Sequence, residues 1–257
     1  MVIVPQRAIE YTSFSPFLDP TDAGIDIRWL KSIDIPGGFV AHIKGKKSHE
    51  IVNQGLTILE RLTHRGAVGA DPKAGDGAGL LMQIPDAYMR EVSGIELPAE
   101  SEYGIGMLFL PREEAARKAL EALVEEIVTA EGQILLGWRT VPVDNSSLGV
   151  SVIPTEPVVR QVFIGRGEGT PDQNALERKL FVIHKLMEGQ STERALAGNE
   201  QFYVNSMSTR TIVYKGMLLA NQVGEYYTDL KDQRVTSALA LVHQRFSTNT
   251  FPTWDLA

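Results

Sequence analysis

The 257-residue chain contains no cysteine. Disulfide bonds, thiolate metal sites and catalysis by a cysteine of this polypeptide are therefore excluded. The sequence also lacks any apolar run that approaches the ~18 residues of a membrane-spanning helix. Its first residues, Met-Val-Ile-Val-Pro-Gln-Arg, lack the basic start and the longer apolar region of a secretory signal. We therefore expect a soluble, cytoplasmic protein with no membrane partner.

Positive charge is also in short supply. The chain has 25 Lys and Arg against 32 Asp and Glu, which gives a formal net charge of -7. Because a protein that binds the nucleic-acid backbone needs a basic face, we expect no nucleic-acid partner. Hydrophobic residues make up 43% of the chain and charged residues 22%, an ordinary globular balance. The length is sufficient for one large core or two small ones.

The N-terminal stretch differs from the remainder in its proline content and in its lack of apolar periodicity. Prolines at positions 5, 16 and 20 interrupt residues 1–34, and only 25–35 shows a partly apolar pattern. We interpret 1–34 as an atypical, irregular and loosely attached leader. Residues 35–257 then form the domain proper.

Strands and helices mix in residues 35–257, but they do not alternate strictly. Several expected strands follow one another without an intervening helix, which favours an α+β fold with antiparallel or mixed sheets over a doubly wound parallel fold. Apolar periodicity predicts helices at 48–63, 113–129 and 174–188, and strands at 38–43, 80–84, 103–110, 133–141, 161–165 and 238–245, with strand pairs within 201–215.

A glycine-dense loop spans residues 69–79. Asp76 lies between Gly75 and Gly77, with Gly79 two residues further on. One interpretation is a tight turn that brings main-chain N–H groups and Asp76 close to a site. The other is a purely structural turn. A dinucleotide site is not expected, because the loop leads into a strand, whereas that fingerprint opens a helix.

Arg245 ends the last expected strand and enters a row of hydroxyls and amides. A guanidinium binds a carboxylate through two charge-assisted hydrogen bonds. Thr248, Asn249 and Thr250 could supply neutral groups around the same small ligand. The alternative is that Arg245 forms an internal ion pair with one of the acidic residues.

The histidines have no close metal-ligand spacing, and no Gly-x-Ser-x-Gly elbow is present. We expect each histidine to be structural and predict no metal ligands in this chain. These residues are His42, His49, His64, His184 and His243.

Several motifs, taken in order, carry a resemblance to a known family. They include Phe39-Val-Ala-His-Ile-Lys-Gly45, Gly75-Asp-Gly-Ala-Gly79 and His243-Gln-Arg-Phe-Ser-Thr-Asn-Thr-Phe-Pro-Thr-Trp-Asp255. Over about 220 residues the chain resembles the glutaminase domain of the glutamate synthase large subunit. That domain is a class II glutamine amidotransferase with an N-terminal nucleophile.

The resemblance implies a four-layer αββα sandwich, here C-terminally incomplete because the oxyanion segment of the family lies beyond Ala257. It implies hydrolysis of glutamine by a cysteine exposed as residue one. Ammonia then passes to a synthase domain of the same parent enzyme for glutamate synthesis from 2-oxoglutarate. The flavin mononucleotide and iron–sulfur cluster of the family belong to other domains, so we expect no cofactor in this segment. An oligomeric assembly is left open.

The resemblance also assigns individual positions. Arg245 and Thr248 match residues that hold the substrate carboxylate, and the Gly75–Gly77 loop is a possible part of the site. Ile35 occupies the position of the nucleophilic cysteine, and Pro36 follows where the family has glycine. Since Ile35 has no nucleophilic atom, we predict that this chain alone releases little or no ammonia from glutamine.

Two other functions remain open. The chain could be a non-catalytic module that binds an amino acid or a partner domain. It could also be an amidohydrolase with another nucleophile, such as Ser32 exposed by processing.

Overall fold

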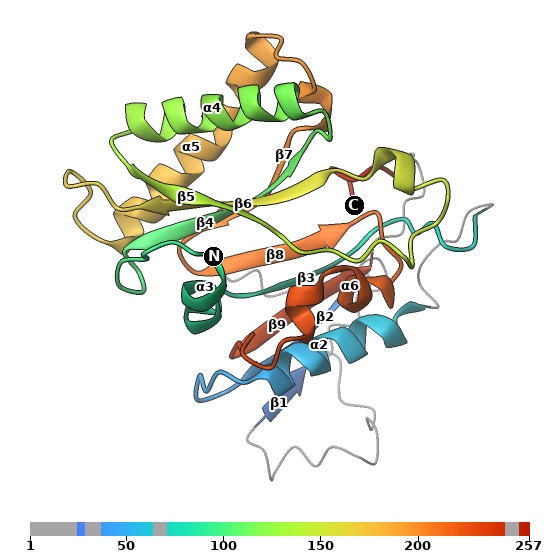
Figure 1. The fold of residues 1–257 in the computed structure, drawn as a ribbon. Coiled ribbons are helices and arrows are strands. Elements are labelled where there is room, and N and C mark those ends of the chain that lie inside the picture. The colour runs from blue at the N-terminus through green and yellow to red at the C-terminus, as the bar shows by residue number, and fades with distance from the viewer. Residues whose placement is uncertain (1–24, 29–36, 64–70, 245–251) are drawn as a thin grey trace, which may run out of the picture. The chain divides into compact units, whose positions relative to one another are not determined.

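The computed structural model of the protein describes residues 25–28, 37–63, 71–244 and 252–257 (Figure 1). The chain divides into two compact units. Unit 1 comprises residues 1–83, 144–154 and 215–257, and unit 2 comprises 84–143 and 155–214. In the described residues, no helix is both long enough and apolar enough to cross a membrane.

Unit 1 is built on a sheet with the strand order β1-β2-β9-β3-β8. The pairs β1–β2, β2–β9 and β3–β9 are antiparallel. Strand β8 contains the point at which the chain passes from unit 2 into unit 1. The bounds are β1 Ile25–Arg28, β2 Gly37–His42, β3 Ala78–Gln83, β8 Thr211–Gly216 and β9 Leu239–Gln244.

Helix α2, His49–Arg61, covers one face of this sheet. The contact is close at Gly55, where an added Cβ would lie 2.7 Å from the Cβ of Ala240. The buried residues of α2 include Ile51, Val52, Ile58 and Leu59, whereas Leu56 and Leu62 are half-exposed. The helix packs on the sheet through the small side of Gly55.

Unit 1 also contains short helical segments. They are η2 Ile153–Thr155, which reaches the boundary with unit 2, α6 Gln222–Tyr226 and η4 Thr228–Lys231.

Unit 2 contains an antiparallel sheet with the order β5-β6-β4-β7. All eight residues of the central strand β4 are buried, which explains why its bounds match the predicted 103–110. The bounds are β4 Tyr103–Leu110, β5 Ile134–Thr140, β6 Val158–Gly165 and β7 Tyr203–Ser208.

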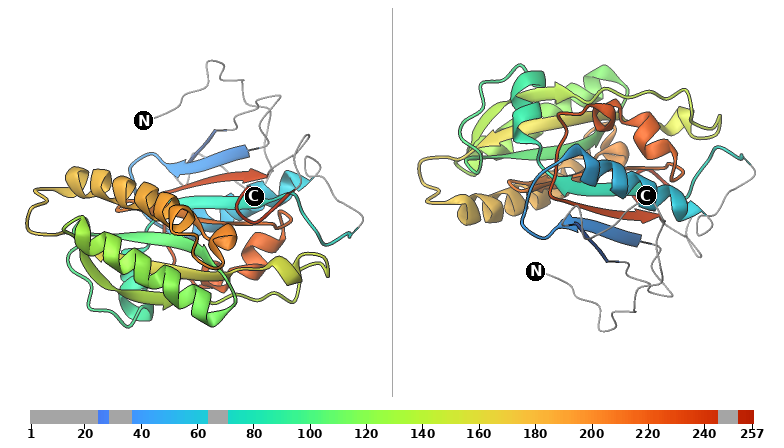
Figure 2. Two further views of the ribbon diagram at one scale, coloured as in Figure 1. Left: turned by 90° about the horizontal axis from the view of Figure 1, so that it is seen from above. Right: turned by 90° about the horizontal axis from the view of Figure 1, so that it is seen from below.

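Two long helices, α4 (Glu114–Ala130) and α5 (Gln173–Glu193), pack side by side on one face of the unit 2 sheet (Figure 2). Their apolar stripes meet Leu108 and Val162 of the sheet in one hydrophobic core. Helix α4 begins where the Glu113 carboxylate accepts hydrogen bonds from the main-chain N–H groups of the first turn. The short segments α3 Asp86–Val92 and η3 Asn199–Gln201 complete the unit.

The α+β class predicted from the sequence is confirmed by two antiparallel sheets with helices packed on them. Several elements were not predicted, among them β1, α3 and α6. Strand β1 lies within the stretch that was expected to be irregular, and it forms a strand because it pairs with β2. Helix α3 was missed because it is short and buries only Tyr88 and Met89, which produces no periodic signal.

Candidate functional site

The first residue of β2 lies beside the last residues of β9. The antiparallel register pairs Gly37 with His243 and Gly38 with Val242. The start of β2 and the end of β9 therefore lie at the same end of the unit 1 sheet. Arg245 follows directly on Gln244, the last residue of β9.

The glycine loop reaches the same end of this sheet. Strand β3 starts at Ala78, which pairs with Gln244, and Gly79 pairs with His243. Residues Gly75–Gly77 immediately precede that start. The beginning of β2, the end of β9 and the beginning of β3 thus come together, although they are far apart in the sequence.

Two glycines of the loop are required by close backbone approaches. A Cβ on Gly75 would lie 2.4 Å from the carbonyl oxygen of Leu218. A Cβ on Gly77 would lie 2.7 Å from the Cα of Ala257, and its φ of +125° is one that side-chain-bearing residues rarely adopt. The tight turn expected from the sequence is therefore present. Asp76 between the two glycines is half-buried.

A carboxylate at the start of this loop ties it to the segment 149–151 of the same unit. Asp71 accepts hydrogen bonds from the main-chain N–H and the hydroxyl of Ser151, at 3.0 and 2.7 Å. These bonds, together with the N–H of Lys73, hold the pKa of the Asp71 carboxyl below its ordinary value.

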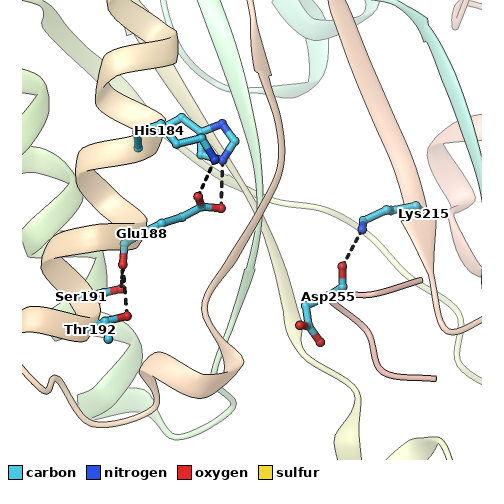
Figure 3. A network of polar contacts seen from close by, with 7 residues as sticks. His184, Glu188, Ser191, Thr192, Lys215 and Asp255 are labelled. Carbon is cyan, nitrogen blue, oxygen red and sulfur yellow. Dashed lines mark hydrogen bonds and ion pairs between the residues drawn. The ribbon is translucent and has the colours of Figure 1, made fainter. Parts of the chain in front are cut away.

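The C-terminal segment 252–257 packs against the same part of unit 1. The Lys215 ammonium donates to the main-chain oxygens of Asp255 and Ala257, both at 2.9 Å, and Figure 3 shows the first of these bonds. Trp254 is buried, and its ring lies 5.7 Å from that of Tyr226. The sequence analysis did not single out Lys215, although it lies in the strand that precedes α6.

Six positions that were predicted to take part in a site lie outside the described residues. They are Ser32, Ile35, Arg245, Thr248, Asn249 and Thr250. Their expected roles as nucleophile, family cysteine position and substrate-binding groups stay predictions.

Three of the histidines form local or main-chain hydrogen bonds in the described part of the chain. The Nδ1 of His42 accepts from the N–H groups of Lys44 and Lys46. The Nδ1 of buried His49 lies 2.8 Å from the Val235 carbonyl oxygen. On α5, His184 pairs with Glu188 one turn later, at 2.9 Å (Figure 3). These contacts are typical of structural histidines.

Of the remaining two histidines, the structure describes only His243. His243 is exposed on β9, and His64 lies outside the described residues. In the part of the chain that is described, no group of three or more His, Asp or Glu side chains could hold a metal ion.

Comparison with known proteins identifies relatives over most of the chain. The model of the family "Glutamine amidotransferases class-II" matches residues 37–257. The glutamate synthase [NADPH] large chain of Bacillus subtilis is 50% identical over 221 residues, and ferredoxin-dependent glutamate synthase 2 of Synechocystis is 40% identical over 223. Glutamate synthase [NADH] of Schizosaccharomyces pombe is 42% identical over 230 residues.

The matches cover most of this chain but only a small part of each relative. Each covers 86% of this chain, but only 14%, 14% and 11% of the respective relatives. The chain therefore spans about one seventh of the length of the curated relatives it matches.

Proposed function

Because the chain belongs to the class II glutamine amidotransferase family, we propose that residues 37–257 bind glutamine as part of a glutaminase domain of the glutamate synthase type. The observation that carries the proposal is the meeting of three strand ends in unit 1. The register Gly37–His243 and Ala78–Gln244 puts the start of β2, the end of β9 and the start of β3 at one end of the sheet. Ile35 precedes β2 by two residues and Arg245 directly follows β9 in the sequence, so we propose that both belong to a site at this end.

Each of these segments supplies a different kind of group to a bound amino acid. The guanidinium of Arg245 pairs with the α-carboxylate through two charge-assisted hydrogen bonds, and the Thr248 hydroxyl adds a neutral one. We propose that the turn Gly75–Gly77 contributes main-chain N–H groups, while its two glycines let the backbone pack against Leu218 and Ala257.

Hydrolysis requires a nucleophile that attacks the amide carbon of glutamine. The family uses a cysteine thiolate, and this chain has isoleucine at position 35 and no cysteine at any position. We therefore propose that this polypeptide binds glutamine but does not release ammonia from it. In a complete enzyme of the type, the ammonia would serve a synthase domain of the same parent chain.

Isothermal titration calorimetry of the 257-residue chain with glutamine tests the proposal. We expect saturable binding by the wild type. Arg245→Ala should weaken it by about a hundredfold, since a charged, two-pronged hydrogen bond is worth roughly 3 kcal/mol. Arg234→Ala is the matched control, because Arg234 is half-exposed and its guanidinium pairs with neighbouring Asp232. Equal binding by Arg245→Ala and the wild type would contradict the assignment of Arg245.

A coupled ammonia assay on the same preparation separates binding from turnover. Binding without ammonia release supports the proposed role. Rapid release by the wild type would refute the absence of catalysis, and intact-mass analysis would then show whether Ser32 had become the first residue. No glutamine binding at all would favour a module that contacts a partner domain.

A further inference from the structure

The side-chain amide of Gln222 joins three distant segments of unit 1. Gln222 is the first residue of α6 and only 2% exposed. Its Nε2 donates to the carbonyl oxygens of Lys73 and Ser147, at 3.1 and 2.6 Å. Its Oε1 accepts from the N–H of Leu219 at 2.8 Å. Both amide hydrogens and one acceptor position are therefore used.

One of these three partners belongs to the glycine loop. Lys73 lies two residues before Gly75, and the backbone of Gly75 packs against the Leu218 carbonyl so closely that a Cβ would lie 2.4 Å from its oxygen. Gln222 thus holds the loop through Lys73 and also binds the N–H of Leu219, whose nitrogen would lie 2.6 Å from a Cβ on Gly75.

Only an amide satisfies this set of partners. A glutamate of the same length can only accept when ionised, so one of its oxygens would face two carbonyl oxygens. A methionine of similar length would leave the carbonyls of Lys73 and Ser147 and the Leu219 N–H without these bonds. Because this position needs two hydrogen-bond donors and one acceptor on one side chain, a glutamine amide satisfies it and neither glutamate nor methionine does.

We infer that Gln222 is a positioning residue for the glutamine site: its amide sets the conformation of the loop 71–77, and through it the affinity for glutamine. Gln222 acts through the loop and does not contact the ligand. This role rests on the proposed function. The second tie of the same loop, from Asp71 to Ser151, leaves the loop attached when the Gln222 bonds are removed.

The test combines hydrogen–deuterium exchange with glutamine titration on the full chain. In Gln222→Met we expect the amides of the segment 71–77 to exchange at least about tenfold faster without glutamine. We also expect the Kd for glutamine to rise about tenfold, because the net free energy of about one hydrogen bond would then be needed to order the loop on binding. Asn221→Ala, at an exposed neighbouring position, should change neither quantity.

A stability-matched variant separates positioning from a general loss of structure. Leu120→Ala, in the core of unit 2, should lower the Tm but leave the glutamine Kd unchanged. If Leu120→Ala and Gln222→Met weaken binding equally, Gln222 has only a structural role and the inference is overturned. Should Gln222→Met fail to fold, Gln222→Asn keeps the amide but shortens its reach, and the same two measurements apply with smaller expected changes.

The exchange experiment does not depend on glutamine. Unchanged exchange at 71–77 in Gln222→Met would overturn the inference even if the wild type binds glutamine. Faster exchange with an unchanged Kd would do so as well. A wild-type chain that binds no glutamine would instead refute the proposed function, and the exchange data would then show only that Gln222 orders the loop.

Discussion

Gly37 and His243 are direct cross-strand partners in the β2–β9 ladder, although they lie near opposite ends of the sequence. Their pairing decides which segments meet at one end of the unit 1 sheet. Gly79 pairs with the same His243 from the other side, so β9 lies between the two glycine-bearing strand starts. The candidate site is therefore organised around the end of one central strand.

Replacing Gly77 by alanine should destabilise the protein more than the same change at Gly45. Both glycines have positive φ, which by itself makes alanine unfavourable by about 1 kcal/mol. Gly77 adds an overlap with Ala257, whereas a Cβ on Gly45 meets nothing within 4 Å. We expect Gly77→Ala to lower the free energy of unfolding by roughly 2 kcal/mol or more in urea titrations. Equal losses at the two positions would show that Ala257 moves away without penalty.

Truncation of Leu120 should destabilise the protein through the core of unit 2. Leu120 is fully buried on α4, and a buried Leu→Ala change typically costs about 3 kcal/mol. Lys118→Ala on the same helix is the matched control. Its exposed ion pair with Glu114 should contribute no more than about 0.5 kcal/mol. Chemical unfolding monitored by circular dichroism measures both, and a loss below about 1 kcal/mol for Leu120→Ala would contradict this packing.

The pKa of Asp71 should report the tie between the glycine loop and Ser151. Hydrogen bonds to the carboxylate lower this pKa in the folded state, so the stabilisation is present above the unfolded pKa of about 4. It is lost as the pH falls through the lower folded pKa. We expect Ser151→Ala to raise the pKa of Asp71 toward its ordinary value in a carbon-13 NMR titration. An unchanged pKa would show that the main-chain donors alone maintain the shift.

The phenol of Tyr103 should remain protonated at a pH where ordinary tyrosines ionise. Burial raises its pKa, and its hydrogen bond to Asp86, at 2.8 Å, raises it further. The associated stability is present below the unfolded pKa of about 10 and is lost as the pH rises through the higher folded value. Ultraviolet difference spectra of folded wild type and Tyr103→Phe should therefore coincide up to about pH 11. If the wild type showed one more tyrosine ionisation below that pH than Tyr103→Phe, the prediction would be wrong.

Local sequence patterns were sufficient for the long, periodic elements. The predicted strand at 103–110 and the helix at 113–129 correspond to β4 and α4 within one residue, because β4 is buried along its whole length and α4 has buried apolar residues at helical spacing. The end of α5 was placed five residues too early, at 188 instead of 193. Its last turn buries only Ser191, so the apolar period had already stopped.

The candidate site could be predicted only in part from local sequence patterns. The glycine loop could be selected from Gly75 and Gly77 alone, since repeated glycine marks a tight turn. Gln222 and Lys215 could not, because their importance depends on carbonyl oxygens 40 or more positions away. A polar side chain within a short helix carries no sign of its distant partners.

The sequence by itself determined the chemistry that is possible: it contains no thiol, and its motifs match class II glutamine amidotransferases. Tertiary structure alone decided which strand ends meet and which buried amide holds the loop beside them. The reason is physical. Periodicity and turn propensity act over a few residues, whereas strand pairing and buried hydrogen bonds join groups that only the folded chain brings within 3 Å of one another.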